Sequence, residues 1–373
     1  MNWRARISPS LIVIAACARP FVAAAAQAGY RVAAFDAFHD VETRHLAAHS
    51  ARVAFSQGGF DAGNLWRELE GLAWPGATVV YGGGLENQPA LIDRIARHFD
   101  LAGNDAATVA RIKNPQQFFS LLDDLGVAYP ETRLDRPRNQ AGWLVKSTGG
   151  SGGTHIRHFE GGEGDYYQRC VQGFPVSVLF LANGAKAEIV GYNEQWLAPA
   201  PGMPCRYGGA VGNADLPDAA RRAMEDAVRM VVAATGLRGL NSMDFMLCGE
   251  KPLALEINPR LSASFDLYDA PDLLQRHLRA CRGELFPLPE RRLGSKSHLI
   301  HYASRDLVID HVFDWPAWVV DTPIAGTLCR KGEPLCTVLA QGCNAEEARS
   351  TVFARARQLE AQLEHATFPV GTQ

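Results

Sequence analysis

The sequence predicts a mixed fold, in which an α/β domain with parallel strands is followed by segments of α+β character. Three observations predict it. The first hundred residues alternate between apolar strand patterns and helix patterns, as expected of an open parallel sheet. Strands, hairpins and amphipathic helices then follow without this alternation. The length of 373 residues corresponds to two or three domains, each long enough to bury a core.

The first strand–helix–strand unit accounts for an N-terminal segment that superficially resembles a signal peptide. Leu11–Ala18 is apolar, but Arg19 and Pro20 interrupt it before it is long enough to cross a membrane. An alanine-rich segment ending at Gly29 and a second apolar run, Arg31–Asp36, complete a βαβ pattern. We therefore expect a Rossmann-like first domain in a cytoplasmic protein.

A later strand of this domain ends in glycines. Val79–Tyr81 runs into Gly82–Gly84, and a helix pattern follows over Pro89–Phe99, which predicts a crevice at the strand ends. The segment lacks the glycine spacing of a dinucleotide fingerprint, so an NAD-linked dehydrogenase is retained only as an alternative.

Capping and breaker residues define the later elements. Asn114 can cap a helix that has Pro115 at its first position and stops at Gly126. An amphipathic helix is expected over residues 218–235, ending at Gly236. The other expected elements are strands at 143–146, 155–159, 166–171, 176–181 and from about 296 onward, and a last helix from 345 to about 363.

Composition excludes several classes of protein. Apolar residues make up 47% and charged residues 21%, as in ordinary globular domains. With 37 basic and 40 acidic residues, the net charge of −3 argues against a nucleic-acid footprint and against a polybasic membrane anchor. The eight cysteines contain no C-x-x-C pair, so we expect free thiols in a reducing compartment and no zinc site.

The most informative segment is a hairpin over residues 241–260. Two apolar strands flank a turn at Gly249–Pro252. Centring the hairpin on Glu250 places Asp244 opposite Glu256 and makes Met246 face Ala254. Because side chains alternate along strands, one face is predicted to carry Asp244, Met246, Cys248, Ala254, Glu256 and Asn258, and the core face Phe245, Leu247, Leu255 and Ile257.

The two opposed carboxylates need compensation, because like charges directly across a strand pair destabilise it. Asp244, Glu256 and Asn258 offer three hard oxygen donors on one surface, which suits Mg²⁺. The alternative is a solvated outer face carrying unrelated acids. Arg260, just beyond the second strand, favours the metal site, since an arginine there can clamp an anion.

A glycine-rich segment provides a candidate phosphate cover. Lys146 ends a strand just before Gly149, Gly150, Ser151, Gly152 and Gly153, whose exposed backbone N–H groups could close over phosphates. The pattern is not a Walker loop, since G-x-x-x-x-G-K is absent and a strand follows. A flexible surface hairpin is the alternative. Lys113, just before the helix cap, is a second candidate phosphate ligand.

In this order, these features resemble the ATP-grasp superfamily over roughly residues 1–290, most specifically in Asp244 and the run Glu256–Arg260. The resemblance implies a Rossmann-like pre-ATP-grasp domain over residues 1–103. It implies an ATP-grasp domain over 104–290, with a glycine-flap subdomain at about 108–170 and a metal-binding subdomain at about 171–290. Residues 291–373 would form a strand-rich C-terminal extension with a terminal helix.

The same resemblance implies the roles of the candidate residues. ATP would lie between the two subdomains with one or two Mg²⁺ ions, or Mn²⁺ in their place. Arg260 and Lys146 would be catalytic, and Asp244, Glu256 and Asn258 would hold the metal. The implied nucleotide-binding residues are Lys113, Lys146, Gly149, Gly150, Ser151, Gly152, Gly153 and a hinge of Gln168, Arg169, Cys170 and Val171. The sequence departs from the family pattern at one point. Related proteins often have an acidic residue shortly after the hinge glycine to bind the ribose, and no acid follows Gly173 here.

Within the superfamily, the chain is similar to carboligases distantly related to biotin carboxylase, with the segment 323–340 matching their small C-terminal extension. It also resembles ligases that join glutamate to tyramine or tyrosine in methanofuran-type cofactor biosynthesis. These resemblances imply an ATP-dependent carboxylate–amine ligase that acts through an acyl phosphate on small molecules, with a homodimer as the default assembly. A carboxylase of the biotin carboxylase type and a non-catalytic ATP sensor are the alternatives. The loop Ala198–Gly212 is either a substrate loop or a connection.

Overall fold

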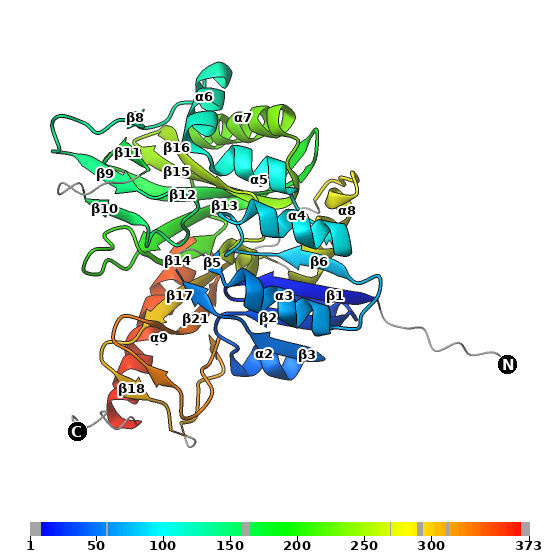
Figure 1. The fold of residues 1–373 in the computed structure, drawn as a ribbon. Coiled ribbons are helices and arrows are strands. Elements are labelled where there is room, and N and C mark those ends of the chain that lie inside the picture. The colour runs from blue at the N-terminus through cyan, green and yellow to red at the C-terminus, as the bar shows by residue number, and fades with distance from the viewer. Residues whose placement is uncertain are drawn as a thin grey trace.

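The N-terminal part of the chain is a parallel sheet with helices packed around it (Figure 1). The structure is a computed structural model that describes residues 9–56, 59–158, 165–268, 270–288, 294–310 and 313–366. The sheet has the strand order β3-β2-β1-β6-β7. Its strands are β1 (Ser10–Ala15), β2 (Arg31–Asp36), β3 (His49–Arg52), β6 (Thr78–Tyr81) and β7 (Asp100–Ala102), and the helices between them are α1 (Arg19–Gln27), α2 (Val41–Leu46), α3 (Ala62–Gly71) and α4 (Pro89–His98).

This order confirms the predicted βαβ reading of the N-terminal segment. β1 and β2 are parallel neighbours along their whole length, with α1 as the crossover between them. Their apolar side chains are buried within the layers of this domain. A small hairpin, β4 (Phe55–Ser56) and β5 (Gly59–Phe60), lies beside the end of β6.

A small antiparallel sheet carries the glycine-rich segment. Its strand order is β10-β9-β11-β8. Helix α5 (Ala106–Lys113) leads into it, and α6 (Pro115–Leu125) follows with the predicted ends: the Asn114 side chain accepts the Gln117 N–H at 3.0 Å, and Gly126 is left-handed with φ 66°. The strands are β8 (Thr132–Arg133), β9 (Trp143–Lys146), β10 (Ile156–His158) and β11 (Tyr166–Arg169).

A long antiparallel sheet forms the centre of the molecule, in the order β16-β15-β12-β13-β14-β17-β21-β19. It continues past the predicted boundary at residue 290, because β14 pairs with β17. Its strands are β12 (Phe174–Asn183), β13 (Ala187–Leu197), β14 (Tyr207–Gly212), β15 (Arg238–Cys248), β16 (Lys251–Asn258), β17 (Ser295–Tyr302), β19 (Val319–Val320) and β21 (Pro334–Gly342). A separate short pair joins β18 (Leu307–Val308) to β20 (Leu328–Cys329).

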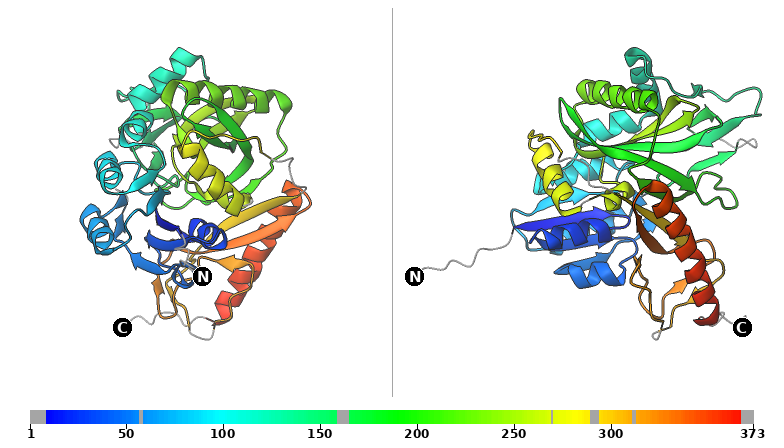
Figure 2. Two further views of the ribbon diagram at one scale, coloured as in Figure 1. Left: turned by 90° about the vertical axis from the view of Figure 1, so that its right-hand side faces the viewer. Right: turned by 180° about the vertical axis from the view of Figure 1, so that it is seen from behind.

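Three helices cover this sheet. The predicted helix over 218–235 is α7 (Asp218–Thr235), whose apolar side packs into the core that it shares with β12 and β15. Helix α8 (Ala270–Cys281) packs against β15 and against α1 of the first domain. Helix α9 (Ala345–Ala366) runs along β17 and β21 of the C-terminal part, as Figure 2 shows.

The hairpin of β15 and β16 has the predicted pairing of Asp244 with Glu256 but contains an irregularity directly beside it. Phe245 pairs with Ala254, and Met246 pairs with Leu253 rather than facing Ala254 as predicted. Leu255 is therefore an extra residue in β16. Because a bulge inserts one residue, it reverses the face of every side chain beyond it. Ala254 is accordingly fully buried in the core, where the strict alternation had placed Leu255.

A buried arginine joins the three parts of the chain. Arg19, at the start of α1, lies 2.6 Å from Asp266 in the 3-10 helix Ala263–Leu267 and 2.8 Å from Asp321 in the C-terminal part. Burial alone would raise the pKa of Asp321, but the charge of Arg19 and its hydrogen bond hold that pKa below the usual range. The arrangement fixes the first domain against both of its neighbours. Among the described residues, every helix is too short or too polar to span a bilayer.

We predict that Arg19→Ala destabilises the protein by about 3–5 kcal/mol at pH 7, because two buried carboxylates lose their partner. The Asp321 contribution is present above its unfolded pKa of about 3.9 and is lost as the pH falls through its lower folded pKa. The loss of stability caused by Arg19→Ala should therefore be smaller at acidic pH. Denaturant unfolding at pH 7 and at pH 3 measures the difference between the variant and the wild type. Arg221→Ala, which breaks an exposed pair with Asp218, is the control, and equal effects of the two variants at pH 7 would contradict the prediction.

Candidate active site

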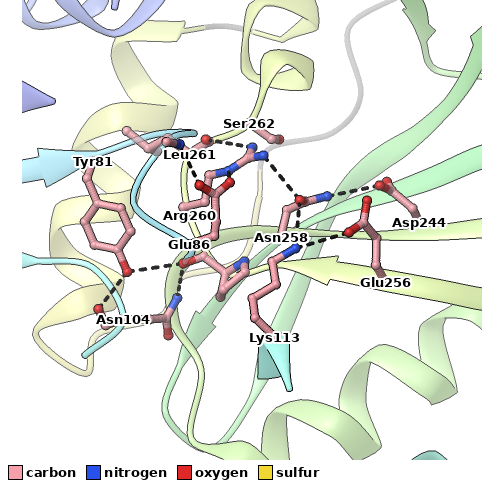
Figure 3. A network of polar contacts seen from close by, with 12 residues as sticks. Tyr81, Glu86, Asn104, Lys113, Asp244, Glu256, Asn258, Arg260, Leu261 and Ser262 are labelled. Atoms are coloured by element: carbon pink, nitrogen blue, oxygen red, sulfur yellow. Dashed lines mark hydrogen bonds and ion pairs between the residues drawn. The ribbon is translucent and has the colours of Figure 1, made fainter. Parts of the chain in front are cut away.

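The predicted metal residues, Lys113 and Arg260 come together where the hairpin of β15 and β16 meets the first domain (Figure 3). Lys113 is the last residue of α5, and Asp244 lies in the middle of β15. Glu256 and Asn258 end β16, and Arg260 follows in the segment that leads back toward the first domain. The pairing of β15 with β16 and the C-terminal end of α5 therefore position the residues of the site.

The two carboxylates are opposite each other and are held by neutral and positive donors. Asp244 accepts from the Asn258 amide nitrogen at 3.0 Å and from the Gln195 amide nitrogen at 3.3 Å. The ammonium of Lys113 lies 3.2 Å from Glu256 and 3.5 Å from the Asn258 side-chain oxygen. Gln195, on β13, did not stand out in the sequence, because its strand is separated from β15 by β12 and the side chain reaches Asp244 only once the central sheet has formed.

The pair shares its negative charge unequally. Burial and the neighbouring charge of Glu256 raise the pKa of Asp244 to about 7. Burial would also raise the pKa of Glu256, but the charges of Lys113, His155 and Lys146 outweigh it and lower that pKa to about 2. Glu256 therefore ionises before Asp244, and a cation bound beside Asp244 would favour the charged form of its carboxyl group.

This donor set fits Mg²⁺. In the described part of the chain, no group of three or more His, Cys, Asp or Glu side chains is arranged to hold a metal ion. A cation here would therefore rest on Asp244 and Glu256, with an amide oxygen, water and phosphate oxygens for the remaining positions, which is a usual Mg²⁺ arrangement. The Asn258 oxygen accepts from Lys113 and Arg260, so it would have to exchange a partner to act as a ligand.

Arg260 is held by a residue that the sequence analysis did not select. Its Nε lies 2.6 Å from a carboxylate oxygen of Glu86, which follows the glycines at the end of β6. Its terminal nitrogens donate to the Leu261 carbonyl at 3.1 Å and to the Asn258 side-chain oxygen at 3.2 Å. The position of Glu86, shortly after a strand and a glycine turn, was the feature of the sequence that could have indicated its role.

The backbone beside Arg260 is fixed by a buried polar network from the first domain (Figure 3). The Asn104 amide nitrogen donates to the Pro259 carbonyl at 2.9 Å and to the Asn241 side-chain oxygen at 2.7 Å. The Tyr81 hydroxyl donates to the Asn104 carbonyl at 2.7 Å. These side chains are buried, so each polar atom depends on its partner. The network therefore sets the path of the chain between Asn258 and Arg260.

Lys146 lies apart from the Lys113 contact, inside the sheet that carries the glycine-rich segment. Its ammonium donates to the Gln168 side-chain oxygen at 2.8 Å, and both residues are buried. Burial lowers the pKa of Lys146, although the charge of Glu256 opposes this effect. Gln168 in turn donates to the Thr132 hydroxyl at 3.0 Å. A polar chain thus runs from β9 through β11 to β8.

The backbone of the predicted hinge is partly engaged. The N–H groups of Arg169 and Cys170 donate to the carbonyls of Glu131 and Gly142, each at 2.9 Å. They are therefore not free to meet a nucleotide base. Val171, next in the hinge, follows the end of β11.

The glycine-rich segment rests between two other parts of the chain, which explains why glycine is needed there. A Cβ on Gly149, at φ 73°, would lie 2.4 Å from the Cβ of Asn87 in the first domain. A Cβ on Gly153, at φ 70°, would lie 1.8 Å from the Cys205 carbonyl oxygen. Gly152 also accepts the Tyr207 N–H at 2.9 Å. The predicted loop Ala198–Gly212 is therefore only partly a loop: from Tyr207 it is strand β14, and both Cys205 before the strand and Tyr207 within it contact the glycine-rich segment.

His155 is a further residue of this region that the sequence analysis left out. Its ring packs against Gly150, where a Cβ would lie 2.1 Å from the ring. Burial lowers the pKa of His155, the charge of Glu256 opposes this shift, and the charges of Lys146 and Lys113 add to it, so the ring lies within electrostatic reach of the site. A histidine two residues after a glycine cluster carries no pattern of its own.

Comparisons with known proteins agree with this arrangement. Residues 112–264 match the family model described as ATP-grasp domain. The biotin carboxylase domain of a single-chain bacterial carboxylase has a TM-score of 0.71 at 18% sequence identity, with 98% of this chain and 90% of that chain covered. An L-amino acid ligase from Bacillus licheniformis has a TM-score of 0.70 at 15% identity, with coverages of 96% and 98%. No curated protein matches the sequence.

A further neighbour was solved with nucleotide. The biotin carboxylase domain dimer of Hydrogenobacter thermophilus 2-oxoglutarate carboxylase, in complex with MgADP, ADP and bicarbonate, has a TM-score of 0.71 at 12% identity, with coverages of 97% and 91%. The chain spans 37–39% of three longer carboxylase chains that it also resembles. The predicted ATP-grasp fold with a Rossmann-like first domain is confirmed, and the neighbours are carboxylases and ligases, the class of enzyme that the sequence predicted.

We predict that Asp244→Asn stabilises the metal-free protein increasingly as the pH rises. A buried acid with a folded pKa of about 7 contributes fully below its unfolded pKa of about 3.9, and this contribution is lost as the pH rises through 7. Asparagine does not titrate, so its advantage should grow by about 2 kcal/mol between pH 5 and pH 8.

Thermal unfolding in the presence of a chelator measures this change. Glu250→Gln, in the exposed turn of the same hairpin, should show no such growth with pH. If the stability difference between Asp244→Asn and the wild type were constant across this pH range, the pKa of the Asp244 carboxyl would not be raised in the folded protein.

Proposed function

We propose that this chain, whose residues 112–264 match the ATP-grasp domain, is an ATP-dependent carboxylate–amine ligase that forms an amide and releases ADP and phosphate. One observation supports this most. Two opposed carboxylates, Asp244 and Glu256, stand beside Lys113 and an anchored Arg260, which suits phosphoryl transfer. The likeness to carboxylases and to an amino acid ligase agrees with this class of chemistry.

In the first proposed step, an oxygen of the substrate carboxylate attacks the γ-phosphorus of ATP, giving an acyl phosphate and ADP. Lys113 and Arg260 neutralise negative charge on the phosphoryl oxygens. A bound Mg²⁺ would supply further charge neutralisation, held by Asp244 and Glu256 with the Asn258 oxygen available to it. Because these groups are positioned before the reaction, little reorganisation is needed in the transition state.

In the second step, an amine attacks the acyl carbon, the C–O bond to phosphate breaks, and phosphate leaves with the electron pair of that bond. The nitrogen loses one proton, which leaves with the phosphate, and the amide remains. An acyl phosphate hydrolyses if water reaches it, so the site needs a cover. We assign this cover to Gly149–Gly153, which rests on Asn87 at one end and on the Cys205 backbone at the other. The exposed N–H groups of such a segment can also bind phosphate oxygens.

The nucleotide is proposed to lie between the small sheet and the hairpin of β15 and β16. Lys146, close enough for its charge to act on Glu256, would reach the phosphates, and Gln168 would hold its ammonium in place. In the hinge, Val171 is the residue that we assign to the base, because Arg169 and Cys170 already donate their N–H groups within the fold. The MgADP of the 2-oxoglutarate carboxylase domain supports nucleotide and metal as the ligands.

The substrates are proposed to be a small carboxylic acid and a small amine in the cytoplasm, without nucleic acid or membrane. Glutamate with tyramine or tyrosine, as in methanofuran-type cofactor biosynthesis, is the first pair to examine, and the L-amino acid ligase among the neighbours supports amino acids generally. A dimer is the default assembly. A biotin carboxylase-type activity is the second candidate, favoured by the biotin carboxylases among the neighbours.

We predict that a screen for ADP release will show turnover with an acid–amine pair and little with bicarbonate. The pairs are glutamate with tyramine, glutamate with tyrosine and a panel of other amino acids, and mass spectrometry identifies the amide. Glu256→Gln should lower ADP release by about 100-fold or more, since it removes the anion that pairs with Lys113 and would hold the metal. Glu250→Gln, in the turn of the same hairpin, is the matched control and should keep full activity.

Other outcomes would replace the proposal. Turnover with bicarbonate alone would identify a carboxylase. Tight MgATP binding without turnover on any pair would identify a sensor. Unchanged turnover in Glu256→Gln would show that the two carboxylates do not serve the reaction.

A further inference from the structure

Glu86 takes no part in the steps proposed above, yet it contacts a residue that does. It lies in the first domain, after the glycine turn that ends β6, whereas Arg260 lies beyond β16. One of its oxygens is 2.6 Å from Arg260 Nε, and the other accepts the Gly84 N–H at 2.5 Å. The contact therefore crosses from the first domain into the site (Figure 3).

The pair is buried, which makes it costly to separate. The Glu86 side chain is 1% exposed and that of Arg260 is 10% exposed. Burial alone would raise the pKa of Glu86, but the charges of Arg260 and Lys113 lower it, so the carboxylate stays ionised. A buried anion that loses its partner carries an uncompensated desolvation cost. Arg260 is thus held at its Nε and cannot swing freely toward or away from a substrate.

Because Glu86 contacts Arg260 at Nε, the two terminal nitrogens of the guanidinium group keep donors for other partners. A guanidinium has five N–H donors. Nε donates to Glu86, and each terminal nitrogen donates once, to the Leu261 carbonyl and to the Asn258 side-chain oxygen. One N–H on each terminal nitrogen therefore has no partner among the described residues. Two such donors on neighbouring nitrogens match the spacing of phosphate or carboxylate oxygens.

We infer that Glu86 is a positioning residue, which anchors Arg260 through Nε so that its two remaining terminal N–H groups face the phosphoryl group in transfer. The inference rests on the proposed function, since it assumes that Arg260 meets that group. It gives the Rossmann-like domain an indirect part in the reaction, through a carboxylate that positions Arg260. Glu86 acts only by way of Arg260.

The test uses the full chain and needs no identified substrate. Calorimetry measures the affinity for MgADP alone and for MgADP with aluminium fluoride, a mimic of a transferring phosphoryl group. We expect aluminium fluoride to tighten binding in the wild type, and Arg260→Ala to remove this gain. Glu86→Ala should reduce the gain about tenfold, the value of one charge-assisted hydrogen bond, without changing the affinity for MgADP alone. Glu86→Gln should lose less, because its amide oxygen still accepts from Nε.

A double variant separates positioning from a general effect on the fold. Because Glu86 acts through Arg260, Glu86→Ala combined with Arg260→Ala should behave as Arg260→Ala alone. If Glu86→Ala does not fold, the same comparison is made with the isosteric Glu86→Gln. The matched control is Glu42→Gln: Glu42 also joins the first domain to another segment, accepting from Thr322 N–H and hydroxyl at 3.0 Å each, but it lies outside the site. This control should keep the full aluminium fluoride gain.

The outcomes distinguish this inference from the proposed function. A gain that survives in both Glu86 variants, or losses that add in the double variant, would overturn the role of Glu86 while leaving the ligase proposal in place. A wild type that shows no gain would overturn phosphoryl transfer itself. Loss of the gain in Glu42→Gln would show that any weakened domain contact has the same effect, and would equally overturn a specific role for Glu86.

Discussion

The opposition of Asp244 and Glu256 across one hairpin is the constraint on which the rest of the centre depends. Two carboxylates at this distance repel each other, and a partly buried position increases the cost. The surrounding residues offset this repulsion. Lys113 pairs with Glu256, and the Asn258 and Gln195 amides donate hydrogen bonds to Asp244. The pair of opposed carboxylates favours binding of a cation between them. The same cations and donors that stabilise it are those that phosphoryl transfer requires.

The site also depends on contacts between separate parts of the chain. Arg260 is anchored by Glu86, and the Pro259 carbonyl by Asn104, so the first domain determines the conformation of the segment beyond β16. Farther away, Arg19 holds Asp266 and Asp321 in one buried cluster. Buried polar contacts of this kind tolerate little displacement, because each separated group would lose a partner that water cannot replace. The domains are therefore fixed relative to one another by polar contacts as well as by apolar packing.

Glycine placement serves the same end by allowing close approach. Gly149 and Gly153 lie where a Cβ would meet Asn87 and the Cys205 carbonyl oxygen. The segment between them can therefore lie flat against two different parts of the molecule. The sequence indicates that a glycine-rich segment follows Lys146, but the surfaces on which it rests come from residues far away along the chain. For this reason the role of the loop around Cys205 was left open by sequence alone, whereas the structure shows that it contacts the glycine-rich segment.

By itself, the sequence determined the features that depend on neighbouring residues along the chain, such as helix ends. Asn114 and Gly126 specified the ends of a helix through capping and a left-handed residue. The sequence also predicted that Asp244 pairs with Glu256, but not for the right reason: the turn is tighter than a hairpin centred on Glu250, since Cys248 pairs with Lys251, and the bulge at Leu255 restores the predicted pair. Only the tertiary structure decided the bulge that moved Ala254 into the core, since a bulge is selected by packing on both faces of the sheet. It likewise decided the choice of Glu86 as partner for Arg260, because the two lie 174 positions apart and no local pattern relates residues that meet only when domains pack.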